Sequence, residues 1–146
     1  MYRLIDKVET NGKGNLSESK VLTAYLESGF IVSLPFGGGA PYDLMVDTGR
    51  RILKVQVKTG RLRNGCILFA AQRISGHHGT RRRKYNEGEF DLFAIYCPDN
   101  DQIYVVPMLG DLAEGRLRLE TTRNNQRQKI RWARDFEFNA HVSDLR

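Results

Sequence analysis

The stretch Pro41-Tyr-Asp-Leu-Met-Val-Asp-Thr-Gly-Arg-Arg-Ile-Leu-Lys-Val-Gln-Val-Lys58 carries the strongest structural signal of the chain. Apolar and polar residues alternate on both sides of Thr48-Gly49, and alternation predicts strands because successive side chains of a strand point to opposite faces. We therefore expect two strands joined by a tight turn. Residues two apart on a strand lie roughly 6–7 Å apart. The polar face would then bring an acid, an amide oxygen and an ammonium into one small volume: Asp43, Gln56 and Lys58.

A helix is predicted just before this hairpin, over residues 14–28, with Asn15 as its N-cap and Gly29 as its stop. Glu18 falls on the same stripe as the apolar residues of this helix, one turn towards the N-terminus. A carboxylate on a core-facing stripe needs a reason. It either points over the sheet towards Asp43 or forms a capping box with Asn15. Beside the polar face of the hairpin, we favour the site role.

Asp43, followed after twelve residues by Gln56-Val57-Lys58, resembles the signature of the PD-(D/E)XK nucleases, with Gln56 in place of the usual acid. The same replacement, together with an upstream acid such as Glu18, resembles the branch of homing endonucleases encoded by group I introns. The upstream acid is also similar to that of archaeal Holliday-junction resolvases. Residues 85–96 and 105–107 resemble the homing branch as well, and the resemblance covers most of residues 12–134.

The resemblance implies an α/β fold, a restriction-endonuclease-like core whose mixed central β-sheet is flanked by helices. It implies a Mg²⁺-dependent (or Mn²⁺-dependent) DNA endonuclease, because a divalent cation stabilises the charge that develops in phosphodiester hydrolysis. The metal ligands would be Asp43, the Gln56 amide oxygen, the backbone carbonyl of Val57 and Glu18. The catalytic residues would be Glu18, Asp43, Gln56 and Lys58, with Lys58 orienting the attacking water and offsetting phosphate charge.

Three readings of the function stay open. The first is a sequence-specific homing endonuclease, and the second is a Holliday-junction resolvase or another structure-selective nuclease. The third is a catalytically inert DNA-binding protein on the same fold, because Gln56 removes one negative charge from the site. The partner is double-stranded DNA or a DNA junction. Cutting two strands requires two active sites, so a homodimer or homotetramer is expected.

The positive charge of the chain is concentrated in two blocks. The net charge is +6, and residues 61–90 carry seven Lys/Arg against two acids, residues 116–134 seven against one. Such blocks fit a phosphate-binding surface, and charge for solubility is the alternative. Tyr85 could stack on a base or pack in the core. The candidate DNA contacts are Lys13, Arg61, Arg63, Arg73, Arg81, Arg82, Arg83, Lys84, Tyr85, Asn124, Gln126 and Arg127.

The length of 146 residues suits one nuclease domain, 1–146, with one core. No apolar run reaches the roughly 20 residues of a membrane span and no signal peptide is visible, so we expect no membrane partner and a cytoplasmic, nucleoid-associated protein. Cys66 and Cys97 read as buried thiols. His77 and His78 are adjacent, which is poor spacing for two ligands of one metal.

The remaining elements are predicted more coarsely. Asp91 is either a hydrogen-bonding residue at the start of a strand, which we favour, or a second-layer residue of the site. Trp132 and Phe136, four apart, should pack a terminal helix. Strands are expected at 30–34, 66–71, 90–97 and 102–107, turns at 59–65 and 98–101, a helical turn at 111–115, and a glycine-rich rim of the site or plain hairpin turn at 35–41.

Overall fold

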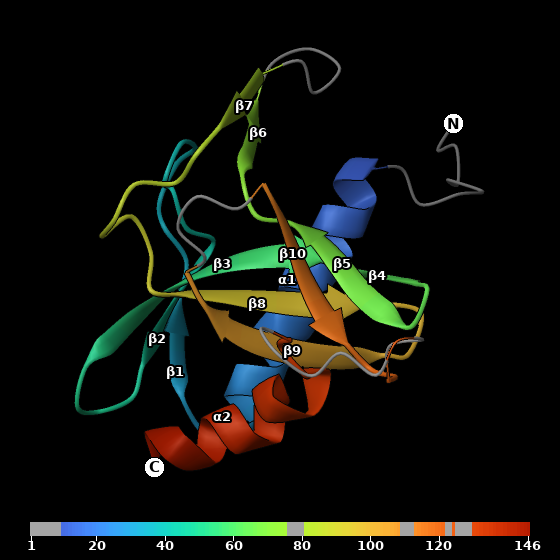
Figure 1. Ribbon diagram of the computed structural model, residues 1–146. Helices are drawn as coiled ribbons and strands as arrows, with labels where there is room; N and C mark the ends of the chain where they lie inside the picture. The colour runs from blue at the N-terminus through green and yellow to red at the C-terminus, as the bar shows by residue number, and fades with distance from the viewer. Residues whose placement is uncertain (1–9, 76–80, 109–112, 122–123, 125–129) are drawn as a thin grey trace, which may run out of the picture.

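The computed structural model describes residues 10–75, 81–108, 113–121, 124 and 130–146. In those residues a five-stranded and a three-stranded sheet pack together with two α-helices, and a third sheet has two strands (Figure 1). The elements are α1 (Thr10–Glu27), β1 (Ile31–Ser33), β2 (Leu44–Asp47), β3 (Ile52–Thr59), β4 (Arg61–Arg63), β5 (Cys66–Ala70), β6 (Arg73–Ser75), β7 (Arg81–Arg83), β8 (Leu92–Cys97), β9 (Gln102–Pro107), β10 (Glu114–Arg118), the 3₁₀ helix η2 (Ala133–Phe136) and α2 (Phe138–Leu145).

The central sheet is mixed, as the sequence predicted. Its strand order is β1-β2-β3-β8-β9, and β3 pairs with β8 in parallel while the other neighbours are antiparallel. The predicted hairpin with its turn at Thr48-Gly49 is β2–β3, and Gly49 adopts φ +80°, which glycine tolerates best. The parallel pair is fixed where β8 begins, because Asp91 accepts a hydrogen bond from Lys54 N (2.8 Å) and donates to Lys54 O (2.9 Å). The prediction of a strand-start role for Asp91 is thus confirmed.

The two faces of the central sheet have separate cores. One face packs under α1 through Val21 and Tyr25, with Leu53, Val55 and Val57 of β3. The other face carries the aromatic cluster around Phe93 and is covered by the second sheet (Figure 1). Alternation along β3 therefore sends the apolar side chains to α1 and the polar ones to the opposite face.

The helix α1 differs from the prediction at its start. It begins at Thr10, so Asn15 lies inside the helix and the predicted N-cap is wrong. A capping box of Asn15 with Glu18 is excluded for the same reason. The predicted stop is right: Gly29 has φ +87°, and Phe30 N donates to Tyr25 O at 3.2 Å, a bond that closes the last turn.

A second, three-stranded sheet with the order β10-β5-β4 was not predicted. The expected turn over 59–65 contains β4, and the chain reverses in the two residues Asn64 and Gly65, which have φ +50° and +70°. The helical turn expected at 111–115 is wrong in its described part, because Glu114–Arg118 is β10. Gly115 is required there, since a methyl group at this position would overlap the ring of Phe69.

The C-terminal region also differs from the prediction. The helical segments are η2 and α2: Phe136 ends η2, and Trp132 precedes both segments instead of lying in the terminal helix. The strands β6 and β7 form a hairpin that the sequence did not predict, and Figure 1 shows it projecting from the body of the fold. Cys66 and Cys97 are buried free thiols, as predicted. Among the described residues, the helices are too short or too polar to cross a membrane.

Candidate active site

Asp43 immediately precedes β2, at the end of the strand where the pairing with β3 stops. The last pair of the two strands is Leu44 with Val55, and Asp43 N still donates to Val55 O at 2.9 Å. Beyond that pair β2 no longer pairs with β3, and the carboxylate of Asp43 lies against the edge of β3 that this leaves open. Its Oδ2 accepts a hydrogen bond of 2.8 Å from Val57 N. The backbone of β3 therefore fixes the acid in place.

Lys58 continues along β3 and its ammonium group is held from two sides. Nζ donates to the backbone carbonyl of Gln72 at 3.3 Å and lies 5.2 Å from the centroid of the Tyr85 ring. This ring is only 7% exposed and meets Phe90 and Phe93 edge-on, at 4.7 and 5.9 Å between centroids. Of the two roles that the sequence left open for Tyr85, the structure shows the packing one.

Glu18 reaches the site from α1. Its carboxylate is close enough to Asp43 for the two negative charges to repel each other. The neighbouring Ser17 and Thr59 hydroxyls share a hydrogen bond of 2.6 Å, which ties this turn of α1 to the end of β3. The helix thus brings a second acid to the open edge of β3, next to Asp43.

Burial shifts the pKa of Asp43, Glu18 and Lys58 in the direction that disfavours the charged form of each group. Burial raises the pKa of Asp43, although the Val57 N–H and Lys58 lower it. Burial, and then the charge of Asp43, raise the pKa of Glu18. Burial lowers the pKa of Lys58, and Asp43 opposes this change. Two acids that are costly to ionise side by side form a place where a bound cation is favourable.

The other oxygen donors come from β3 itself. Gln56 projects on the same face as Lys58, and Val57 O points to the same side of the strand as Val57 N, which faces Asp43. Within the described part of the chain no three His, Cys, Asp or Glu residues gather in a way that could hold a metal. A metal here would need the amide and carbonyl oxygens beside the two acids. His77 and His78 lie outside the described residues.

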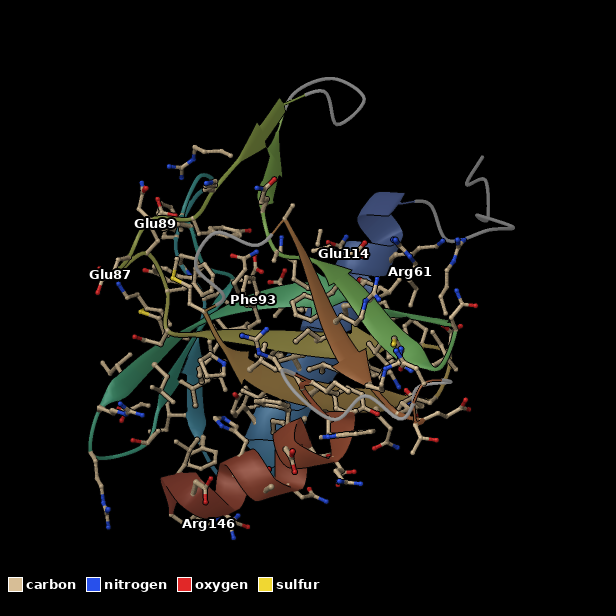
Figure 2. The ribbon with its side chains drawn as sticks, viewed as in Figure 1. Arg61, Glu87, Glu89, Phe93, Glu114 and Arg146 are labelled. Carbon is tan, nitrogen blue, oxygen red and sulfur yellow. The ribbon has the colours of Figure 1, made fainter. Side chains whose placement is uncertain are left out.

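The candidate DNA contacts are scattered over several elements. Lys13, Lys84 and Asn124 are exposed, and Arg61 and Arg63 are exposed on β4. Two of these arginines have acidic partners: Arg61 lies 3.2 Å from Glu114, and Arg83 2.9 Å from Glu89 (labelled in part in Figure 2). Arg73, Arg81 and Arg82 lie on the β6–β7 hairpin. Gln126 and Arg127 fall outside the described residues.

Sequence reasoning missed the groups that hold Lys58 and the contact that joins α1 to the end of β3. The Gln72 carbonyl has no sequence signal, because any residue can supply a backbone oxygen. The contact of Ser17 with Thr59 joins residues 42 apart and is equally invisible to local patterns. A signal did exist for the β4–β5 hairpin, since Asn-Gly between two short runs is a strong indication of a two-residue turn.

The fold and this site define a class of protein: the chain belongs to the PD-(D/E)XK endonuclease family, whose model matches residues 8–139. It is also similar to a solved structure, the bacterial homing endonuclease I-Ssp6803I. The two share 25% sequence identity over 92% of this chain and 93% of that one, with a TM-score of 0.73. No curated protein matches the chain.

Proposed function

We propose that this endonuclease is metal-dependent and hydrolyses phosphodiester bonds of double-stranded DNA. The observation that carries the proposal is the convergence of Glu18, Asp43 and Lys58 at the open edge of β3. Mg²⁺ or Mn²⁺ fits the donor set, because Mg²⁺ prefers oxygen ligands and is held by one or two carboxylates. Asp43, Glu18, the Gln56 amide oxygen and Val57 O would hold it. When bound, the ion would polarise the scissile phosphate and favour ionisation of the attacking water.

The residues of the chain supply orientation and charge. Asp43 is positioned by the Val57 N–H and cannot rotate without losing that bond. Lys58 is anchored by the Gln72 carbonyl and the Tyr85 ring, so its remaining N–H groups can donate to a phosphate oxygen or to the water. Gln56 contributes an oxygen without a charge. Asp43 and Glu18 would then supply two negative charges to a divalent cation, so the site would carry no excess negative charge to repel the phosphate.

Homing-endonuclease-like, sequence-specific cleavage is the form of activity that we favour. It is supported by the similarity to I-Ssp6803I over nearly the whole length of both chains. We further propose a single nuclease domain over 1–146 that acts at the nucleoid as a homodimer or homotetramer, because a double-strand cut needs two such sites. The family match over residues 8–139 supports the single domain.

Cleavage of mixed substrates tests the proposal. Random-sequence plasmids and synthetic four-way junctions would be incubated with Mg²⁺ or with EDTA, with Lys58→Met as the inactive control. Mg²⁺-dependent cutting of duplex at rare sites is expected. Junction cutting without sequence preference would favour a resolvase. Tight binding without cutting of either substrate would favour the inert DNA-binding protein. Gln56 is the observation behind this alternative, because it takes the place of an acid that would help to hold a metal.

A further inference from the structure

The second sheet carries two rows of arginine on its outer face. Ile67 and Phe69 of β5 face the core, so Cys66 and Leu68, which alternate with them, point to the opposite face, where Leu68 is partly exposed and Cys66 is buried. Strand register places an arginine of β4 and one of β10 on either side of each of these residues. Across β4, β5 and β10, the two rows are Arg61–Leu68–Arg116 and Arg63–Cys66–Arg118. We call Arg61, Arg63, Arg116 and Arg118 the arginine face.

The four cations are close together and mostly in solvent. Residues two apart on a strand lie about 6.6 Å from each other, which is within the Debye length of about 8 Å at physiological salt. Strands two apart lie about 9.6 Å from each other, which is slightly more than that length. Arg61, Arg63 and Arg116 are exposed and Arg118 is half-buried. Glu114 pairs with Arg61 at 3.2 Å and offsets one charge. Such a concentration of positive charge on a flat face is suited to a polyanion.

The arginine face leads away from the catalytic lysine along a single strand. Two residues after the end of β5 comes Gln72, whose carbonyl accepts the hydrogen bond of Lys58. Leu68 and Cys66, which mark the two rows, precede Gln72 by four and six residues. At the roughly 3.3 Å rise of a strand these separations are about 13 and about 20 Å. For a duplex that lies along β5, they would correspond to about four and six base pairs at roughly 3.4 Å per base pair.

We propose that the arginine face binds the phosphates of the DNA duplex about four to six base pairs to one side of the cleaved bond. The proposal rests on the proposed endonuclease function for the position of that bond. Phosphate contacts of this kind fix the register of a protein on its duplex and carry no sequence information themselves. Base recognition would then come from other parts of the chain.

Binding in EDTA, where no cleavage is expected, gives the first test. The probe is a fluorescently labelled duplex of random sequence, and the readout is anisotropy over a series of salt concentrations. The double variant Arg116→Ala/Arg118→Ala should bind more weakly, and the slope of log K against log salt should fall by about 2, since each phosphate contact contributes about 0.9. The same loss of slope for a duplex of RNA, with tighter binding than DNA, would overturn the assignment to DNA.

The matched control removes the same charge elsewhere. Arg50 and Arg51 are exposed in the β2–β3 turn, which lies on the far side of the fold from β4 and β10 in Figure 1. Arg50→Ala/Arg51→Ala should leave the slope unchanged. An equal fall in both double variants would show a general charge effect and overturn the arginine face. Glu114→Gln, which frees Arg61, should strengthen binding, and Glu27→Gln on α1 should not.

Substrate truncation locates the contact relative to the cut. With a cleaved target in hand, the duplex is shortened one base pair at a time from either side. Cleavage by the wild type should weaken on one side once fewer than about six base pairs remain, and the Arg116→Ala/Arg118→Ala variant should show no such dependence. Equal dependence in both proteins overturns the proposal while the nuclease stands. If neither protein cuts anything, the anisotropy series still decides the arginine face, and the proposed function alone fails.

Discussion

Replacing Asp43 by asparagine and by alanine separates the chemistry of the site from its structural role. In Asp43→Ala the part-buried Val57 N–H loses its acceptor, which costs about 1–3 kcal/mol of stability. In Asp43→Asn an amide oxygen can still accept that bond. The asparagine also removes a charge that is costly in this place, because burial raises the pKa of Asp43 and Glu18 repels it. Its stability should stay within about 1 kcal/mol of the wild type.

Thermal melting in EDTA and cleavage in Mg²⁺ measure the two effects. For a chain of this size each kcal/mol shifts the melting temperature by roughly 2–4 °C. Both variants should lose more than a hundredfold in cleavage rate, because removal of a charged metal ligand costs several kcal/mol in the transition state. Cleavage by Asp43→Asn near the wild-type rate would remove Asp43 from the metal site. Equal melting temperatures for the two variants would refute the structural role of the Val57 hydrogen bond.

Three other perturbations test the same site. Because the pKa values of Asp43 and Glu18 are raised from their ordinary 3.8 and 4.5, the folded state holds these protons more tightly, so the metal-free protein should lose stability as pH rises above those values. Mg²⁺ should offset this loss of stability, and Asp43→Asn should lose less stability than the wild type over the same pH range. Melting curves recorded across pH measure both effects. Gln56→Glu should lower the Mg²⁺ concentration needed for half-maximal cleavage and Gln56→Ala should raise it; unchanged metal titrations would exclude Gln56 as a ligand. Tyr85→Leu should slow cleavage by roughly 2- to 30-fold, the range of a cation–π contact with Lys58, while Tyr85→Phe should not, and equal rates in the two variants would contradict the contact.

The positions of Asp43, Gln56 and Lys58 in the candidate site could be predicted from the sequence because they depend on local regularities. The alternation in β2 and β3 fixes which residues share a face, and the turn at Thr48-Gly49 fixes which of them lie opposite each other. Asp43, Gln56 and Lys58 followed from these two facts. Glu18 depended on helical periodicity alone, and it lies at the site even though the start of α1 was placed four residues too late.

Of the second sheet only β5 was predicted, at 66–71; β4 and β10 were missed because both strands are short and face solvent over much of their length. In β4 all three residues, Arg61–Arg63, are exposed, so the apolar period that announces a strand is absent. In β10 the alternation exists, with Gly115 and Leu117 buried, but glycine is a poor strand signal by itself. The pairing of β5 with β10 joins residues more than 40 positions apart in the chain, so no local pattern announces it. The sequence could not decide between packing and stacking for Tyr85, since the polar segment around it gave no sign of the Phe90 and Phe93 rings that it contacts.

The substitution of glutamine for the usual acid makes the site depend on two elements instead of one. With an acid at position 56, the charge that balances a metal would lie on the β2–β3 hairpin alone. With Gln56, half of the negative charge is on α1, at Glu18. The distance of Glu18 from the other ligands is then set by the packing of α1 on β3, through the buried Val21 and the Ser17–Thr59 hydrogen bond. If the site holds a metal as proposed, we expect its affinity to be coupled to helix–sheet packing, so that a variant that loosens α1 weakens metal binding without changing the signature residues themselves.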